Sequence, residues 1–387
     1  MIRIFHKIHL WLSVPFGIII TLICFSGAML VFESEITRSI RKDVYYVAST
    51  HDEALPMDIL MEKVKATLPD SVSITGVTVF ADNERTYQVN LSKPRRASIF
   101  IDQYSGTITG RYERIAFFGT MFRLHRWLLD NSNPHGEGLK IGKLIVGVST
   151  VIFVIALMTG VVIWWPRVRN GLRRSLAITA KNGWSGFWKS LHIAGGMYAL
   201  VLVLAMALTG LTWSFGWYRS AFYAVCGVEY IPRNHNGQNA NNNHSTHETR
   251  RKHLTDGREH LKRYRQQSEF GIWQQVYDEL KTQNPNATQI TIGAEKASVT
   301  LGDMGNGRAS DTYAYNRGAE KPNLSIKYAD SAPADRLRGW IYSIHTGSFG
   351  GLFTRILWFL AALLGASLPV TGYYIWIRHL MKRRHNV

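Results

Sequence analysis

Four histidines lie at or just outside one end of each of four long apolar stretches. The motifs IHLW, LHRW, LHIAGG and IHTGSFGG contain His9, His125, His192 and His345. Ionisable groups beside membrane spans are costly and tend to be functional. Imidazoles from different helices can hold a metal from two sides, as the axial ligands of a haem do. The pattern therefore indicates metal or haem sites at the ends of spanning helices.

Each apolar stretch also contains a hydroxyl residue followed by glycine. The four pairs are Ser26-Gly27, Thr159-Gly160, Thr209-Gly210 and Thr371-Gly372. His9 precedes Gly27 by 18 residues, and His192 precedes Gly210 by 18, which is about 27 Å of helix rise. This repetition predicts that the chain is a duplication of one unit, with both copies starting on the same side of the membrane.

The apolar stretches are long enough to cross a bilayer. They run from Leu10 to Phe32, Ile141 to Trp165, Leu191 to Trp217 and Phe349 to Ile377. Each exceeds the roughly 20 residues that a helix needs to cross about 30 Å of hydrocarbon. The first runs well past the roughly 7 to 15 residues of a secretory signal's apolar core, so we expect it to be retained as an anchor.

Basic residues predict the orientation of these spans. Twelve Lys and Arg residues, and no Asp or Glu, lie before the first span, between the second and third, and after the fourth. The positive-inside rule places these three segments, and both termini, in the cytoplasm. The net charge of +18 then reflects topology, and no nucleic-acid partner is expected.

This topology sorts the histidines and glycines into two levels. The inner level holds His9, His192, Gly160 and Gly372, and the outer level holds His125, His345, Gly27 and Gly210. A macrocycle between two imidazoles needs ligands from different helices and small residues beside its face, and both levels supply them. His6 is the alternative to His9, while His379 and His135 are weaker substitutes. No CxxCH motif is present, so any haem would be bound noncovalently.

The two long external segments, 33–140 and 218–348, are predicted to be small α+β domains. The first has a helix from Ala54 to Leu68 and strands from Ser71 to Phe80, Thr86 to Leu91, Ala97 to Asp102 and Thr107 to Gly110. The second has a helix from Phe270 to Thr282 and strands from Gln289 to Gly293, Ala297 to Leu301 and Thr312 to Asn316. The Asn-rich segment 233–255 is expected to be disordered, and its irregularly spaced histidines are not expected to bind a metal.

The predicted organisation has eight parts. They are a cytoplasmic N-terminus with the first span (1–32), an external domain with the His125 segment (33–140), the second span (141–165), a basic cytoplasmic loop (166–190), the third span (191–217), a second external domain (218–348), the fourth span (349–377) and a basic cytoplasmic tail (378–387). The fold class is therefore a four-helix membrane bundle with two external α+β domains.

Several motifs resemble those of the PepSY-associated transmembrane family, which includes siderophore reductases of the bacterial inner membrane. The motifs are IHLWLS, LHRWLL, MTGVVIWWPR, LHIAGGMY, IHTGSFGG and the strand-turn segment IFIDQYSGTITG. The resemblance implies a reductase with two b-type haems, the inner held by His9 and His192 and the outer by His125 and His345. It also implies that the two PepSY-like domains are periplasmic.

The implied reaction passes electrons across the lipid bilayer to a ferric siderophore and releases Fe(II), which binds oxygen donors less tightly. No GxGxxG motif follows a predicted strand, so the electron donor is expected to be a quinol or a separate protein. The alternative function is non-enzymatic: a PepSY membrane protein that binds peptides or regulates a protease or transporter. Haem absorbance of the purified protein would separate the two.

Overall fold

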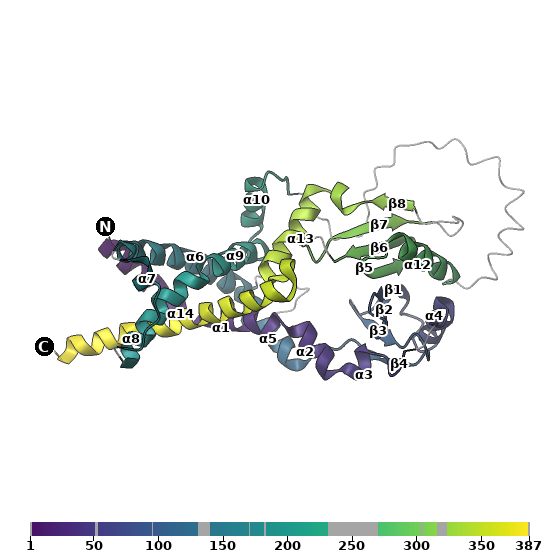
Figure 1. The fold of residues 1–387 in the computed structure, drawn as a ribbon, viewed down its shortest axis with the longest axis horizontal. Coiled ribbons are helices and arrows are strands. Elements are labelled where there is room, and N and C mark those ends of the chain that lie inside the picture. The colour runs from purple at the N-terminus through teal and green to yellow at the C-terminus, as the bar shows by residue number, and fades with distance from the viewer. Residues whose placement is uncertain are drawn as a thin grey trace, which may run out of the picture.

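Four long helices form the elongated part of the molecule. The computed structural model describes residues 2–50, 53–94, 96–130, 140–169, 171–181, 183–230, 270–302, 305–315 and 323–385. Figure 1 shows the bundle with both chain termini at its free end and a β-sheet at the other. The long helices are α1 (Ile2–Leu30), α6 (Ile141–Val168), α9 (Gly196–Ser214) and α14 (Gly351–His385). All four are long and apolar enough to cross a membrane, as the sequence predicts.

The bundle is held together by apolar packing inside and exposes apolar side chains outside. Helix α1 packs against α6 and α14, and α9 packs against the same two helices. Buried Ile20, Phe153 and Val203 belong to its central cluster. On the outer surface Ile18 is 66% exposed and Val201 is 71% exposed. Such a surface is unfavourable in water and suits the acyl chains of a bilayer.

The third span differs from its predicted limits. Its helical run begins with α8 (Gly183–Ser190), continues through the π-helix η1 (Leu191–Gly195) and ends with α9 at Ser214. Phe215 has extended backbone angles and breaks the helix. Trp217, the predicted end of the span, therefore lies on the next helix, α10 (Gly216–Val225).

The two segments between the spans, 33–140 and 218–348, build one sheet together. Its strands are β1 (Ile74–Phe80), β2 (Tyr87–Leu91), β3 (Ser98–Ile101), β4 (Ile108–Arg111), β5 (Ala287–Gly293), β6 (Lys296–Leu301), β7 (Ser310–Ala314) and β8 (Asn323–Ile326). All pairings are antiparallel and the order is β4-β3-β2-β1-β5-β6-β7-β8. The sequence pattern predicts seven of these strands in two domains, without β8 and without the β1–β5 junction.

The junction of β1 and β5 explains why the two halves form a single unit. Thr78 pairs with Thr291 in register, and their hydroxyl oxygens are 2.9 Å apart. If the halves stayed apart, β1 and β5 would each expose a row of unpaired backbone groups. Helices α4 (Met57–Lys65) and α12 (Gly271–Gln283) share one apolar core with the sheet, in which Leu60, Val64 and Leu280 are fully buried.

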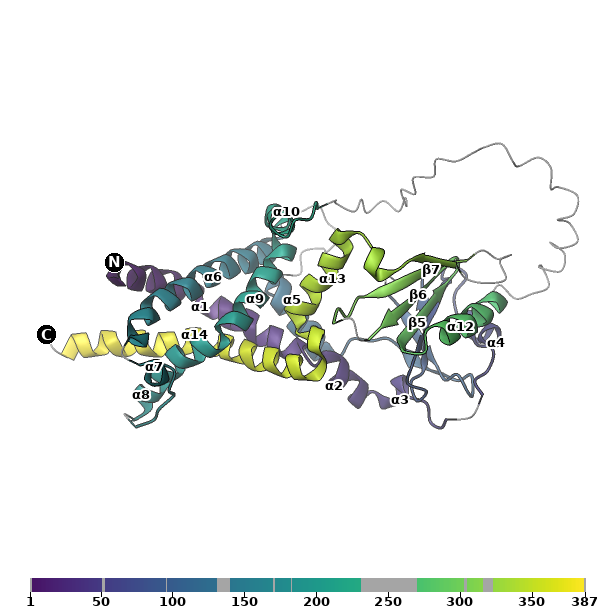
Figure 2. The ribbon, with the colours of Figure 1, turned by 45° about the horizontal axis from the view of Figure 1, so that its top comes forward.

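Short helices connect the sheet to the bundle. They include α2 (Glu33–Ile40), α3 (Lys42–Tyr45), α5 (Ala116–Trp127), α13 (Pro333–Thr346), η2 (Tyr328–Asp330) and η3 (Ser348–Gly350). Figure 2 shows α5 and α13 between the bundle and the sheet, while α7 (Leu172–Ser175) and α8 lie near the opposite end. The Asn-rich segment 233–255 and its histidines lie outside the described residues.

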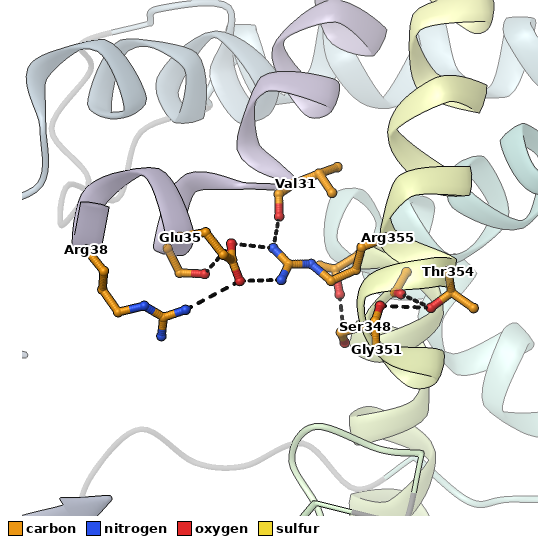
Figure 3. Close-up of polar contacts among 10 residues, drawn as sticks. Val31, Glu35, Arg38, Ser348, Gly351, Thr354 and Arg355 are labelled. Atoms are coloured by element: carbon orange, nitrogen blue, oxygen red, sulfur yellow. Dashed lines mark hydrogen bonds and ion pairs between the residues drawn. The ribbon is translucent and has the colours of Figure 1, made fainter. Parts of the chain in front are cut away.

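An ion pair fastens α2 to the start of α14 (Figure 3). Arg355 on α14 binds both carboxylate oxygens of Glu35 and also donates to the carbonyl of Val31 just beyond α1. Partial burial alone would raise the pKa of the Glu35 carboxyl, but its hydrogen bonds and the charge of Arg355 hold that pKa at about 2.

This low pKa gives a pH prediction for stability. The ordinary pKa of the group is 4.5, so the ion pair should stabilise the fold fully above that pH and progressively less as the pH falls toward about 2. We expect Glu35→Gln to lower the thermal unfolding temperature at pH 7, with a difference from wild type that shrinks below pH 4.5. Unfolding of detergent-solubilised protein measures both, and a pH-independent difference would contradict the assignment.

Candidate haem-binding site

The structure brings the four predicted histidines together in two pairs. His9 on α1 faces His192 on η1, with ring centroids 6.3 Å apart. His125 on α5 faces His345 on α13, with ring centroids 6.1 Å apart. Each pair joins elements that are far apart in the sequence, and His345 also meets the edge of Trp213 at 5.1 Å. The sequence did not predict the contact with Trp213, because a tryptophan near the end of a span is also typical of the aromatic belt at the membrane–water interface.

At the first pair, each Nδ1 atom bonds to a neighbouring spanning helix. His9 Nδ1 lies 3.0 Å from the Ala156 carbonyl and 3.0 Å from Thr159 Oγ1 on α6. His192 Nδ1 lies 3.0 Å from the Leu368 carbonyl and 2.9 Å from Thr371 Oγ1 on α14. Each histidine thus binds a hydroxyl residue and the carbonyl three residues before it.

The second pair repeats this arrangement. His125 Nδ1 lies 2.9 Å from the Ile23 carbonyl on α1. His345 Nδ1 lies 2.9 Å from the Met206 carbonyl and 3.2 Å from Thr209 Oγ1 on α9. Ile23 again precedes a hydroxyl residue, Ser26, by three positions, although that hydroxyl bonds back to carbonyls of its own helix.

These partners decide the tautomer of the imidazoles. A carbonyl can only accept, so each Nδ1 must carry the proton and donate it. The Thr159 hydroxyl uses its own proton on the Ala156 carbonyl, which leaves its lone pairs to accept as well. In a neutral ring Nε2 is then unprotonated and able to bind a metal. Throughout the described part of the chain, the hydrogen bonds of these four rings go through Nδ1.

Burial keeps the second pair neutral. Removal from water lowers the pKa of His125, and it lowers the pKa of His345 to about 4, with a smaller contribution from the nearby His125. Both rings are therefore uncharged near neutral pH, which is the form that binds a metal.

The four glycines lie against the imidazoles. A Cβ atom at Gly27 would lie 2.8 Å from His125 Cε1, and one at Gly210 would lie 3.1 Å from His345 Cε1. The corresponding distances are 3.7 Å from Gly160 to His9 and 3.4 Å from Gly372 to His192. Gly27 and Gly210 therefore make room for the rings of His125 and His345, whereas a Cβ at Gly160 or Gly372 would make only an ordinary contact. The role of the four glycines beside a macrocycle stays a prediction.

The structure distinguishes His9 from its alternatives. His6 is exposed and its Nδ1 bonds to the Ile2 carbonyl of its own helix at 3.1 Å, so it does not join His192. His379 is exposed near the end of α14, and His135 lies outside the described residues. His192 lies on the π-helical turn of the third span, a distortion that is frequent at functional sites.

The spacing of each pair suits one metal atom between two rings. Two metal–nitrogen bonds of about 2.0 Å, each extended by about 1.2 Å to a ring centroid, put the centroids about 6.4 Å apart. The observed 6.3 and 6.1 Å agree with this value. Among the described residues no cluster of three or more His, Cys, Asp or Glu could hold an ion by itself. Two imidazoles at this spacing match a group that supplies its other ligands, as haem does.

Comparison with known proteins gives a family for the chain. No curated protein matches it. The family model described as the PepSY-associated TM region matches residues 6–379, which include both histidine pairs, the four long helices and the sheet. The four apolar helices and this match over nearly the whole length show that the chain is a multi-pass membrane protein of the PepSY-associated transmembrane family.

Proposed function

We propose that this protein is a transmembrane electron carrier that binds two b-type haems, one between His9 and His192 and one between His125 and His345. The observation that carries the proposal is the double pair of imidazoles, each spaced for a shared metal and each with Nδ1 bonded to a helix carbonyl. Haem iron with two imidazole ligands supplies one-electron transfer between Fe(III) and Fe(II).

The chain's own residues orient and isolate the ligands. The Nδ1–H bonds fix the direction of each ring and raise the basicity of Nε2. Because the partner carbonyls belong to the spanning helices, the ligand geometry depends on bundle packing. The four histidines are partly buried, and the degree of burial around a bound haem affects its reduction potential.

We further propose the direction and the partners of the transfer. The basic segments support a cytoplasmic location for both termini in the inner membrane, so the His9–His192 pair would be the inner site and the sheet would be periplasmic. Electrons would then pass from a quinol or separate donor through the bilayer to a periplasmic ferric siderophore, whose reduction to Fe(II) releases the iron.

A duplicated chain accounts for the repeated geometry. Corresponding histidines bond to corresponding helices, since His9 and His192 contact the second span of each half, and His125 and His345 contact the first. The sheet also has four strands from each half, with β1 and β5 at its centre. We propose that two copies of a span–domain–span unit gave rise to this molecule.

Haem stoichiometry tests the proposal directly. Protein purified with adequate haem supply should show b-type bands in the reduced-minus-oxidised spectrum and two haems per chain. His345→Ala should lose one haem and keep the other, because the His9–His192 pair is separate. Absence of b-type bands would favour the peptide-binding or regulatory alternative, and two haems in His345→Ala would refute the pairing.

The acceptor needs an independent test. Dithionite-reduced protein mixed with a ferric siderophore should be reoxidised, and an Fe(II)-specific chelator should turn coloured in step with the loss of the reduced bands. The matched iron-free siderophore is the control. Equal reoxidation rates with and without iron in the siderophore would exclude this acceptor while leaving the haem sites in place.

The glycines give a graded prediction. Gly27→Ala should displace His125, because its Cβ would lie 2.8 Å from the ring, and should therefore reduce haem at the second pair. Gly160→Ala is the matched control, since its Cβ would lie 3.7 Å from His9, an ordinary contact. The haem-to-protein ratio measures both variants. Equal loss in the two would show that contact with the ring does not explain these glycines.

A further inference from the structure

Helix α2 lies where the bundle meets the sheet, and two of its acidic residues each bind an arginine. Glu33 accepts from Arg114 Nε and Nη2 at 2.5 Å each. Glu35 accepts from Arg355 Nη2 at 2.7 Å and also from its Nη1. Both pairs are bidentate, the geometry in which carboxylate and guanidinium bind most strongly and with a fixed orientation. The eight-residue helix therefore holds two distant parts of the chain.

The first pair leads to His125. Arg114 lies between β4 and α5, on the segment that returns from the sheet to the bundle. Its guanidinium carbon is 4.2 Å from the centroid of the Phe122 ring, and Phe122 lies three residues before His125 on the same helix. Residues three apart share one face of a helix. Glu33 thus fixes α5 through Arg114 on the side near the His125 ligand.

The second pair leads to His345. Arg355 lies near the start of α14, and Trp358 follows it by about one helical turn. Trp358 Nε1 donates to the Ile344 carbonyl at 2.6 Å, directly before His345. The indole also packs so closely on Gly347 that a Cβ there would lie 2.6 Å from it. Arg355 and Trp358 on α14 therefore link Glu35 to the backbone directly beside His345.

Both ion pairs are partly shielded from water. The Arg355 and Glu33 side chains are 18% and 20% exposed, and their partners Glu35 and Arg114 are 39% and 30% exposed. Partial shielding strengthens the attraction between opposite charges, while the remaining exposure to water screens it. Arg355 also bonds to the Val31 carbonyl, which secures the end of α1, the helix that carries the acceptor for His125.

We propose that Glu33 and Glu35 are positioning residues that together set the separation of His125 and His345. Their arginine partners lie on the segment just before α5 and at the start of α14, whose Trp358 holds α13. Helix α2 therefore ties both supports to one short helix, which also joins α1 to the sheet. The consequence for haem rests on the proposed function, but the positional claim concerns the protein alone. The two parts can therefore be tested separately.

The test compares Glu33→Gln, Glu35→Gln and the double variant with Glu113→Gln. Glu113 is exposed and directly precedes Arg114, so its change removes the same charge from the same region. In the full chain in detergent, amide hydrogen exchange in α5 and α13 should become about fivefold faster in the double variant, as expected for loss of ion pairs of this kind. Exchange in α9 and in Glu113→Gln should remain unchanged.

A second measurement distinguishes a positioning role at the histidines from a purely structural contribution to stability. The low-spin electron paramagnetic resonance signal that disappears in His345→Ala should shift in Glu33→Gln and Glu35→Gln, while the signal of the other pair stays constant. Combining Glu33→Arg with Arg114→Glu restores a charge pair in reversed order and should return both the signal and the exchange rates toward wild type.

The outcomes decide the proposal. Exchange rates and signals equal to those of Glu113→Gln would overturn it. Faster exchange with an unshifted signal, or without rescue by the reversed pair, would also overturn it, because the residues would then have only a structural role. If the wild-type protein bound no haem, the proposed function would fail, and exchange with its rescue would still decide whether these carboxylates hold α5 and α13 in place.

Discussion

The geometry of the site depends on one hydrogen bond, made four times: the bond from a histidine Nδ1–H to a backbone carbonyl of a spanning helix. A helix carbonyl is normally bound within its own helix, but its second lone pair can accept a further proton. The carbonyls of Ile23, Ala156, Met206 and Leu368 serve in this way. Each bond fixes a ring, its tautomer and the distance between two elements at once.

The contacts around these bonds make the bundle and the sites interdependent. Gly27 and Gly210, each four residues after an acceptor, let the rings of His125 and His345 lie closely against the helix. The second pair, His125 and His345, lies on α5 and α13, which also connect to the sheet. A displacement of the sheet relative to the bundle would therefore act on His125 and His345 before it reached His9 and His192. The ion pairs of Glu33 and Glu35 resist such a displacement.

Much of the site could be predicted because the regular rise of a helix converts sequence intervals into depth in a membrane. That relation predicts that His9 lies near Gly160 and that His125 lies near Gly27, and both contacts are present in the structure. The choice of His9 over His6 required the structure, since both lie on the same side of α1 and only packing against α6 separates them. The carbonyl partners could not be predicted, because backbone acceptors leave no residue signature.

The sequence by itself determined the four apolar helices, seven of the eight strands and the four histidines with their hydroxyl–glycine partners, because these follow from local periodicity and composition. Tertiary structure decided that the segments 33–140 and 218–348 share one sheet, since the pairing of β1 with β5 joins residues more than two hundred positions apart. It also decided that α2 forms ion pairs with Arg114, just before α5, and with Arg355, on α14. Such long-range contacts depend on how the helices and strands pack against one another, and a local sequence pattern does not encode that packing.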